Sequence, residues 1–137
     1  MRAEELRQLY YLNREIEQDQ KRLNEIETAA AGTTVSITGL PHIKYTSDKT
    51  ALAADIADIK ELIEAKKRLC IAEYKRLMRY ISSLDDSFMR QLLTFRYVNG
   101  FTWVQVAMHI GGGNTDDSVR KAHKRFLEKE ALSHLND

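Results

Sequence analysis

Residues 84–129 read LDDSFMRQLLTFRYVNGFTWVQVAMHIGGGNTDDSVRKAHKRFLEK, and the helix start and stop signals in this stretch decide the fold of the C-terminal third. Ser83 or Asp85 is the expected N-cap of a first helix, whose first-turn acids suit the positive end of the helix dipole. Asn99 and Gly100 end this helix through a residue that tolerates left-handed geometry. Its expected packing face consists of Leu84, Phe88, Leu92, Phe95 and Val98.

A second, shorter helix is expected to follow at residues 102–110, with Thr102 as its cap and Gly111-Gly112-Gly113 as its stop. Asn114 or Thr115 then caps a final helix. Two short helices joined by a glycine turn form a helix-turn-helix pattern. The residues expected to point inward are Phe101, Val104, Ala107, Met108 and Ile110 in the shorter helix, and Val119, Ala122, Phe126 and Leu127 in the final one.

Basic charge is concentrated in the final helix. Residues 118–129 carry five cations against one acid, Glu128, whereas the whole chain has a formal net charge of only +1. Cations on the outward face of such a helix are suited to bases and phosphates in a major groove, while Asp116 and Asp117 are interpreted as first-turn acids. The candidate DNA-binding residues are Thr115, Ser118, Arg120, Lys121, Lys124, Arg125 and Lys129.

The same stretch resembles the fourth conserved region of sigma-70-type factors, in which a helix ending in Arg-Tyr and Gly precedes a Trp-opened scaffold helix and a Val-Arg recognition helix. It is also similar to small phage and prophage proteins, including ArpU-type transcriptional regulators, which place such a module after a coiled-coil arm. The resemblance implies structural roles for Arg96, Tyr97 and Trp103, and a DNA-facing role for the final helix. Here the turn GGGNT is about two residues longer than in that pattern.

The N-terminal part carries two amphipathic stripes with steps of three and four residues, over residues 2–30 and 48–82. Asp19 interrupts the first stripe and Lys66 the second, and the two are candidates for setting the register. We expect the helices to pair as a long antiparallel, coiled-coil-like hairpin over residues 1–82, followed by the three-helix module at 83–137. The fold class is therefore all-α. The connector at residues 32–47, rich in β-branched residues, is either a two-stranded flap or a mobile loop.

Several classes of protein are excluded on composition and spacing. The single cysteine, Cys70, has no disulfide partner and is expected to be a packed, reduced thiol. His109 and His123 lack ligand partners at metal-binding spacing, and no phosphate-binding loop or catalytic triad is present, so we expect no metal, no cofactor and no enzyme. No stretch approaches the roughly 20 apolar residues of a membrane span, which predicts a soluble, intracellular protein. The resemblance to phage and prophage proteins implies that its location is the cytoplasm of a bacterial host.

The leading hypothesis is a sequence-specific transcriptional regulator that binds double-stranded DNA. Two alternatives belong to other classes: an interaction protein whose hairpin binds RNA polymerase or another phage or host protein, and a small DNA-packaging subunit. The seams of the hairpin are also compatible with a homodimer. The recognised DNA sequence and the choice between activation and repression are not encoded in any motif.

Overall fold

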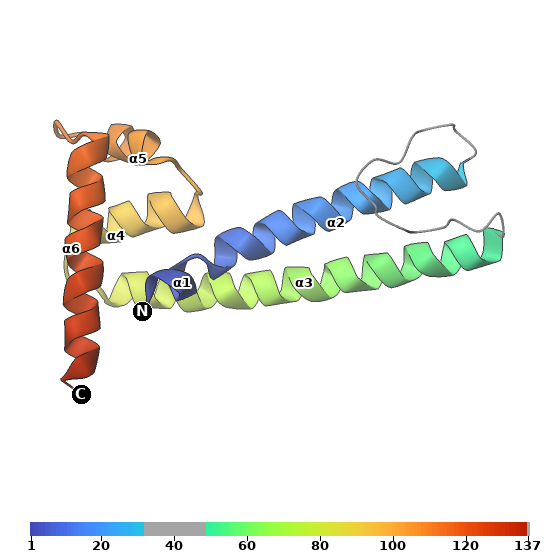
Figure 1. The fold of residues 1–137 in the computed structure, drawn as a ribbon, viewed down its shortest axis with the longest axis horizontal. Coiled ribbons are helices and arrows are strands. Elements are labelled where there is room, and N and C mark those ends of the chain that lie inside the picture. The colour runs from blue at the N-terminus through green and yellow to red at the C-terminus, as the bar shows by residue number, and fades with distance from the viewer. Residues whose placement is uncertain (32–48, 137) are drawn as a thin grey trace. The chain divides into compact units, whose positions relative to one another are not determined.

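In a computed structural model that describes residues 1–31 and 49–136, every regular element is helical (Figure 1). The prediction of an all-α chain is confirmed. The connector expected at residues 32–47 lies outside the described residues. The helices are α1 (Ala3–Leu6), α2 (Gln8–Ala30), α3 (Lys49–Ser83), α4 (Ser87–Leu93), α5 (Trp103–Ile110) and α6 (Asp116–Leu135), and a π-helical turn, η1 (Thr94–Val98), directly continues α4.

The chain forms two compact units. The first combines Met1–Tyr11 with Ile71–Asp137, and the second is Leu12–Cys70. The expected boundary near Ser82 therefore lies inside the sequence range of the first unit, to which the start of the chain and the last turns of α3 also belong. Helices α2 and α3 each contribute residues to both units.

Within the unit Leu12–Cys70, contacts join α2 to α3 in antiparallel order. Asn13 accepts a hydrogen bond from the Cys70 thiol at 3.1 Å, and Asp19 pairs with Lys66 at 2.5 Å. Further along α2, Glu27 lies 3.4 Å from Lys60. The partner of each successive α2 residue thus lies earlier in α3. Among the described residues of this unit, the buried apolar ones are Leu23, Ile26 and Ile63.

The Cys70 thiol is half-buried and its burial raises the pKa. Because only the thiolate is a good nucleophile, a raised pKa makes this thiol less reactive near neutral pH. The hydrogen bond to Asn13 adds a specific packing contact. These features agree with a structural thiol.

The unit formed by Met1–Tyr11 and Ile71–Asp137 has one apolar core. Its members come from every helical element of the unit, so the first turns of the chain and the end of α3 are packed with the C-terminal helices. At its edge, Glu130 of α6 accepts a hydrogen bond from Tyr80 at 3.2 Å and lies 3.6 Å from the N-terminal ammonium. The buried apolar residues are Leu6, Leu9, Leu77, Ile81, Met89, Leu92, Leu93, Tyr97, Val106, Ala107 and Val119.

The helix expected to begin at Ser83 or Asp85 begins instead after Asp86, whose side chain accepts a hydrogen bond from the Phe88 amide at 3.0 Å. The expected packing face was also only partly right: Leu92 is buried, but the other buried positions are Met89, Leu93 and Tyr97. The observed face is displaced by one residue from the expected one, because Met89, Leu93 and Tyr97 recur at steps of four and so share one side of the helix. Gly100, with φ of 72°, follows the helix as predicted.

The face that helix α5 buries agrees only in part with the expected one, since Ala107 is buried as predicted. Thr102 is its N-cap, as predicted, and accepts a hydrogen bond from the Gln105 amide. Val104 and Met108 were predicted to point inward, but their side chains are 56% and 73% exposed, whereas Val106 is fully buried. The prediction counted Phe101 as part of the helical repeat, although the helix begins only at Trp103. That error rotated the predicted face.

Among the described helices, none is both long enough and apolar enough to cross a membrane.

Candidate nucleic-acid interface

The first turn of α6 is fixed by its own side chains. The Thr115 hydroxyl accepts a hydrogen bond from the Ser118 amide at 3.1 Å, and the Ser118 hydroxyl accepts one from the Thr115 amide at 2.9 Å. This reciprocal capping box satisfies two backbone donors at the helix start. Both residues were proposed as DNA contacts. The structure gives their hydroxyl groups a capping role, with Thr115 exposed and Ser118 half-buried.

The next two candidates are exposed and paired with acids of their own helix. Arg120 lies 2.7 Å from Asp116, and Lys121 lies 2.9 Å from Asp117. The side chains of Arg120 and Lys121 are 53% and 68% exposed. The Lys121 ammonium holds the pKa of Asp117 below its usual value, so this carboxylate stays ionised. Exposed pairs of this spacing are weak, so the cations are not locked in place.

Lys124, Arg125 and Lys129 are also exposed, and none of them forms an ion pair with a carboxylate among the described residues. Arg125 and Lys129 border a shallow depression whose other wall includes Asp85 and Asp86.

The seven candidates do not form one surface. Because each residue turns an α-helix by about 100°, Lys121, Lys124 and Arg125 share the face opposite the buried residues Val119 and His123. By the same geometry Arg120 and Lys129 lie on opposite flanks of this face. We call Lys121, Lys124 and Arg125 the outward basic face. The carboxylates of Asp117 and Glu128 lie on the same side of the helix.

Observed α6 extends beyond the segment from which the basic excess was inferred. It includes Asp116, Asp117 and Glu130 in addition to Glu128, so five cations stand against four acids. Two of these acids pair with cations of the first half of the helix, and Glu130 turns toward Tyr80. The helix is thus nearly neutral as a whole, and the three cations of the outward basic face have Asp117 and Glu128 on the same side of the helix.

A buried polar cluster lies at the inner face of α6. His123 is only 8% exposed, its Nε2 atom lies 2.5 Å from the Tyr97 hydroxyl, and its ring lies 4.8 Å from that of Trp103. Burial first, and then the cations Arg96 and Arg7, lower the pKa of His123 to about 4. The Arg96 guanidinium lies 4.4 Å over the Trp103 ring and donates a 2.9 Å hydrogen bond to the Phe101 carbonyl oxygen.

The family resemblance implied structural roles for Arg96, Tyr97 and Trp103, and these residues lie in or beside this cluster. The burial of His123 was not predicted. A signal was present, because His123 is four residues after Val119 and therefore on the same helix face. Within the described part of the chain, no three His, Cys, Asp or Glu side chains gather where they could hold a metal ion.

Comparison of the chain with protein-family models, curated proteins and solved structures finds no match. The function has to be argued from the residues themselves.

Proposed function

We propose that this chain is a sequence-specific DNA-binding transcriptional regulator of the phage type, in which α5 and α6 act as a helix-turn-helix and α6 enters the major groove. The observation that carries the proposal is the outward basic face of Lys121, Lys124 and Arg125. It is exposed to solvent, while the opposite side of the same helix is anchored through Val119 and His123. A helix held on one side and cationic on the other suits groove binding.

The neighbouring helices support this proposal. Helix α5 packs against α6, and α4 contacts both, so the helix that carries the cations rests on two helices that also contact each other. The glycine turn between α5 and α6 has positive φ angles at Gly111, Gly112 and Gly113. In the proposed complex, Lys121 contacts base edges, and Lys124 and Arg125 contact phosphates. Arg120 and Lys129 reach the backbone from the flanks.

Fluorescence anisotropy with a pool of mixed-sequence duplexes tests the proposal first. At low ionic strength the full chain is expected to bind the pool, and binding is expected to weaken steeply as salt is added. Selection of bound fragments from random DNA is then expected to enrich one motif. Failure to bind any duplex at low ionic strength would overturn the proposal, and binding without enrichment would overturn sequence specificity.

An interaction protein is the second candidate function, and one observation favours it. Leu62 and Leu69 on α3 lie seven residues apart in the unit Leu12–Cys70 and are 50% and 59% exposed. Leucines at this spacing share one helix face, which suits docking of another amphipathic helix. Replacement of both by Glu would abolish a complex made through this face, whereas DNA binding through α6 would be retained.

A further inference from the structure

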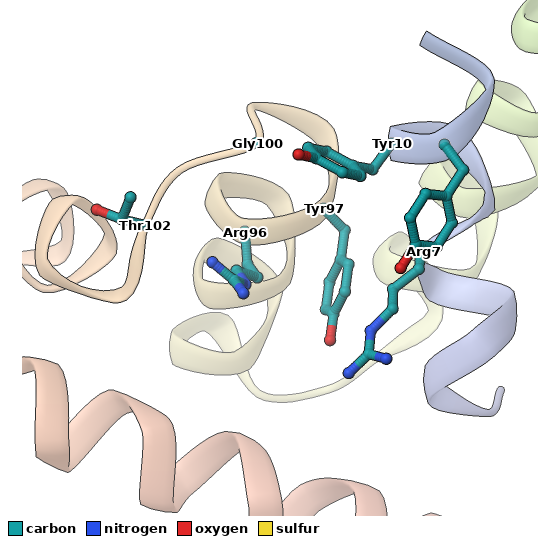
Figure 2. Close-up of a pocket in the computed structure, with 7 residues that line it drawn as sticks. Arg7, Tyr10, Arg96, Tyr97, Gly100 and Thr102 are labelled. Carbon is teal, nitrogen blue, oxygen red and sulfur yellow. The ribbon is translucent and has the colours of Figure 1, made fainter. Parts of the chain in front are cut away.

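A pocket of about 370 Å³ lies within the unit formed by Met1–Tyr11 and Ile71–Asp137 (Figure 2). One side is formed by Arg7, Tyr10 and Tyr11, and the other by residues around η1 and the start of α5, including Arg96, Tyr97 and Thr102. Figure 2 shows the hydroxyl end of Tyr97 and the guanidinium of Arg7 directed toward the same region. The volume lies within the range of about 300–1,000 Å³ that is typical of small-ligand sites.

The charge of this pocket is unbalanced. Two guanidinium groups, Arg7 and Arg96, line it, and no Asp or Glu side chain does. Among the described residues, neither arginine forms an ion pair with a carboxylate. Both cations also act on the buried groups beside the pocket, because they lower the pKa of His123 and oppose the rise that burial causes in the pKa of Tyr97. Two uncompensated cations in a partly enclosed site favour a ligand with two negative charges.

One of the two cations is already fixed in position. The hydrogen bond to the Phe101 carbonyl and the stacking over Trp103 hold the Arg96 guanidinium in one orientation. A side chain that is held before the ligand arrives loses little entropy on binding. Thr102, the N-cap of α5, lies on the same side, where the positive end of the helix dipole adds to the favourable potential for an anion.

Aromatic rings form much of the remaining wall. Tyr10 and Tyr11 meet edge to face with ring centroids 5.5 Å apart, and they are 45% and 54% exposed. Exposed tyrosines beside a cationic pocket offer flat apolar faces on which a planar ring such as a nucleobase can stack. The pocket therefore combines a place for a dianion with a place for a planar ring.

We propose that this pocket binds a small phosphate monoester that carries a planar ring, which is the chemistry of a nucleoside monophosphate. The phosphoryl group lies between Arg7 and Arg96, and the ring stacks on the exposed tyrosines. The site is distinct from the outward basic face of α6 and goes beyond the proposed function, since ligand binding here does not require that the chain bind DNA.

Heteronuclear NMR titration of the full chain tests this proposal with three probes: adenosine monophosphate, adenosine and inorganic phosphate. The monophosphate is expected to shift the amide resonances of Tyr97, Gly100 and Thr102 and the imidazole resonance of His123, and to bind at least about tenfold more tightly than either fragment. Absence of these shifts with the monophosphate would overturn the proposal. Equal affinity for inorganic phosphate would overturn the role of the ring.

Variants locate the site. Arg7→Gln removes one cation from an exposed position. It is expected to lower the affinity for the monophosphate at least about tenfold, which is typical of a lost charge-assisted contact. Arg68→Gln makes the same change at an exposed position of α3 outside the pocket. This variant is expected to bind the monophosphate with the affinity of the unmodified chain. Equal affinity of the Arg7 and Arg68 variants would overturn the assignment of the pocket. This experiment measures binding of the small ligand directly, so a negative result would not bear on the DNA-binding proposal. A negative result with DNA would likewise not bear on the pocket.

Discussion

The Tyr97 hydroxyl oxygen lies 2.5 Å from Nε2 of His123, and this hydrogen bond joins η1 to α6 inside the unit formed by Met1–Tyr11 and Ile71–Asp137. With the tyrosine as donor, Nε2 is the acceptor and the imidazole is neutral. A protonated imidazole would lose this acceptor and would be buried near two arginines. Burial first, and then Arg96 and Arg7, accordingly lower the His123 pKa to about 4.

Acidification is therefore expected to lower the free energy of unfolding. The loss occurs over the pH range between the pKa of His123 in the unfolded chain and its pKa in the folded chain. Below the usual value of about 6.5 the unfolded chain binds a proton that the folded chain does not, so stability falls as the pH drops toward 4. The loss is on the order of 3 kcal/mol and is complete near the folded pKa. Chemical unfolding at pH values from about 7.5 to about 4.5 measures it.

His123→Gln removes this titration and is expected to flatten the pH dependence, although its stability at neutral pH is lower because the buried hydrogen bond is altered. His134→Gln is the matched control, since His134 is exposed near the end of α6. Parallel pH profiles for the His123 variant and the unmodified chain would contradict the assignment.

A second prediction concerns the contribution of the Asp19–Lys66 ion pair to stability. Asp19 is 7% exposed and lies between Lys66 and Arg22 in the α2–α3 seam. Asp19→Leu leaves the Lys66 ammonium partly buried beside Glu15 alone, and is expected to cost about 2 kcal/mol in the free energy of unfolding. Urea unfolding monitored by circular dichroism provides the measurement.

The double variant Asp19→Leu/Lys66→Leu replaces both members of the pair with apolar residues. It is expected to regain the lost stability or to exceed it, because the desolvation of two charges is then removed. A double variant that is less stable than Asp19→Leu would show that the ion pair contributes more than a continuous apolar seam.

Salt dependence distinguishes phosphate contacts from general charge effects. If Lys124 and Arg125 contact phosphates, Lys124→Ala/Arg125→Ala is expected to reduce the slope of log affinity against log salt by about 2, since each contact contributes about 0.9. Lys21→Ala/Lys67→Ala removes the same charge from exposed positions of α2 and α3 and is expected to leave the slope unchanged. Equal slopes for the two double variants would argue against the outward basic face.

The first-turn acids of α6 oppose DNA binding in the proposed complex. Asp117→Asn releases Lys121 from its ion pair and removes a carboxylate from the outward basic face. The variant is expected to bind duplexes about threefold more tightly at low ionic strength. Asp58→Asn, at an exposed position of α3, is the control for net charge. Weaker DNA binding by the Asp117 variant would indicate that the carboxylate contacts the duplex directly.

Features that depend on local sequence could be predicted. The spans of the two long helices, the Thr102 and Thr115 caps and the Gly100 stop follow from hydrophobic repeats and capping chemistry. The polar interruptions at Asp19 and Lys66 were named as candidates for setting the register, and in the structure they pair with each other.

Features that depend on helix phase or distant packing could not be predicted. The π turn at η1 has no sequence signature, and Tyr97 rather than Phe95 is buried because it shares the helix face of Met89 and Leu93, which the apolar pattern alone did not single out. Burial of His123 depends on Tyr97, 26 residues earlier in the chain. The pocket between Arg7 and Arg96 requires the first turns of the chain to pack with η1 and α5, and no local pattern encodes that contact.

The turn before α6 supplies the last prediction. Gly111 adopts φ 72° and ψ −151°, a region that is essentially restricted to glycine, and its carbonyl oxygen accepts a 2.7 Å hydrogen bond from the Asn114 side chain. A Cβ at this position would meet no atom within 4 Å, so the cost of Gly111→Ala comes from the backbone alone. We expect a loss of about 1–3 kcal/mol in unfolding free energy. Val104→Ala, on the exposed side of α5, is expected to change stability much less. A Gly111 variant as stable as the Val104 variant would show that the turn can adopt another conformation, and the placement of α6 after α5 would then not depend on this glycine.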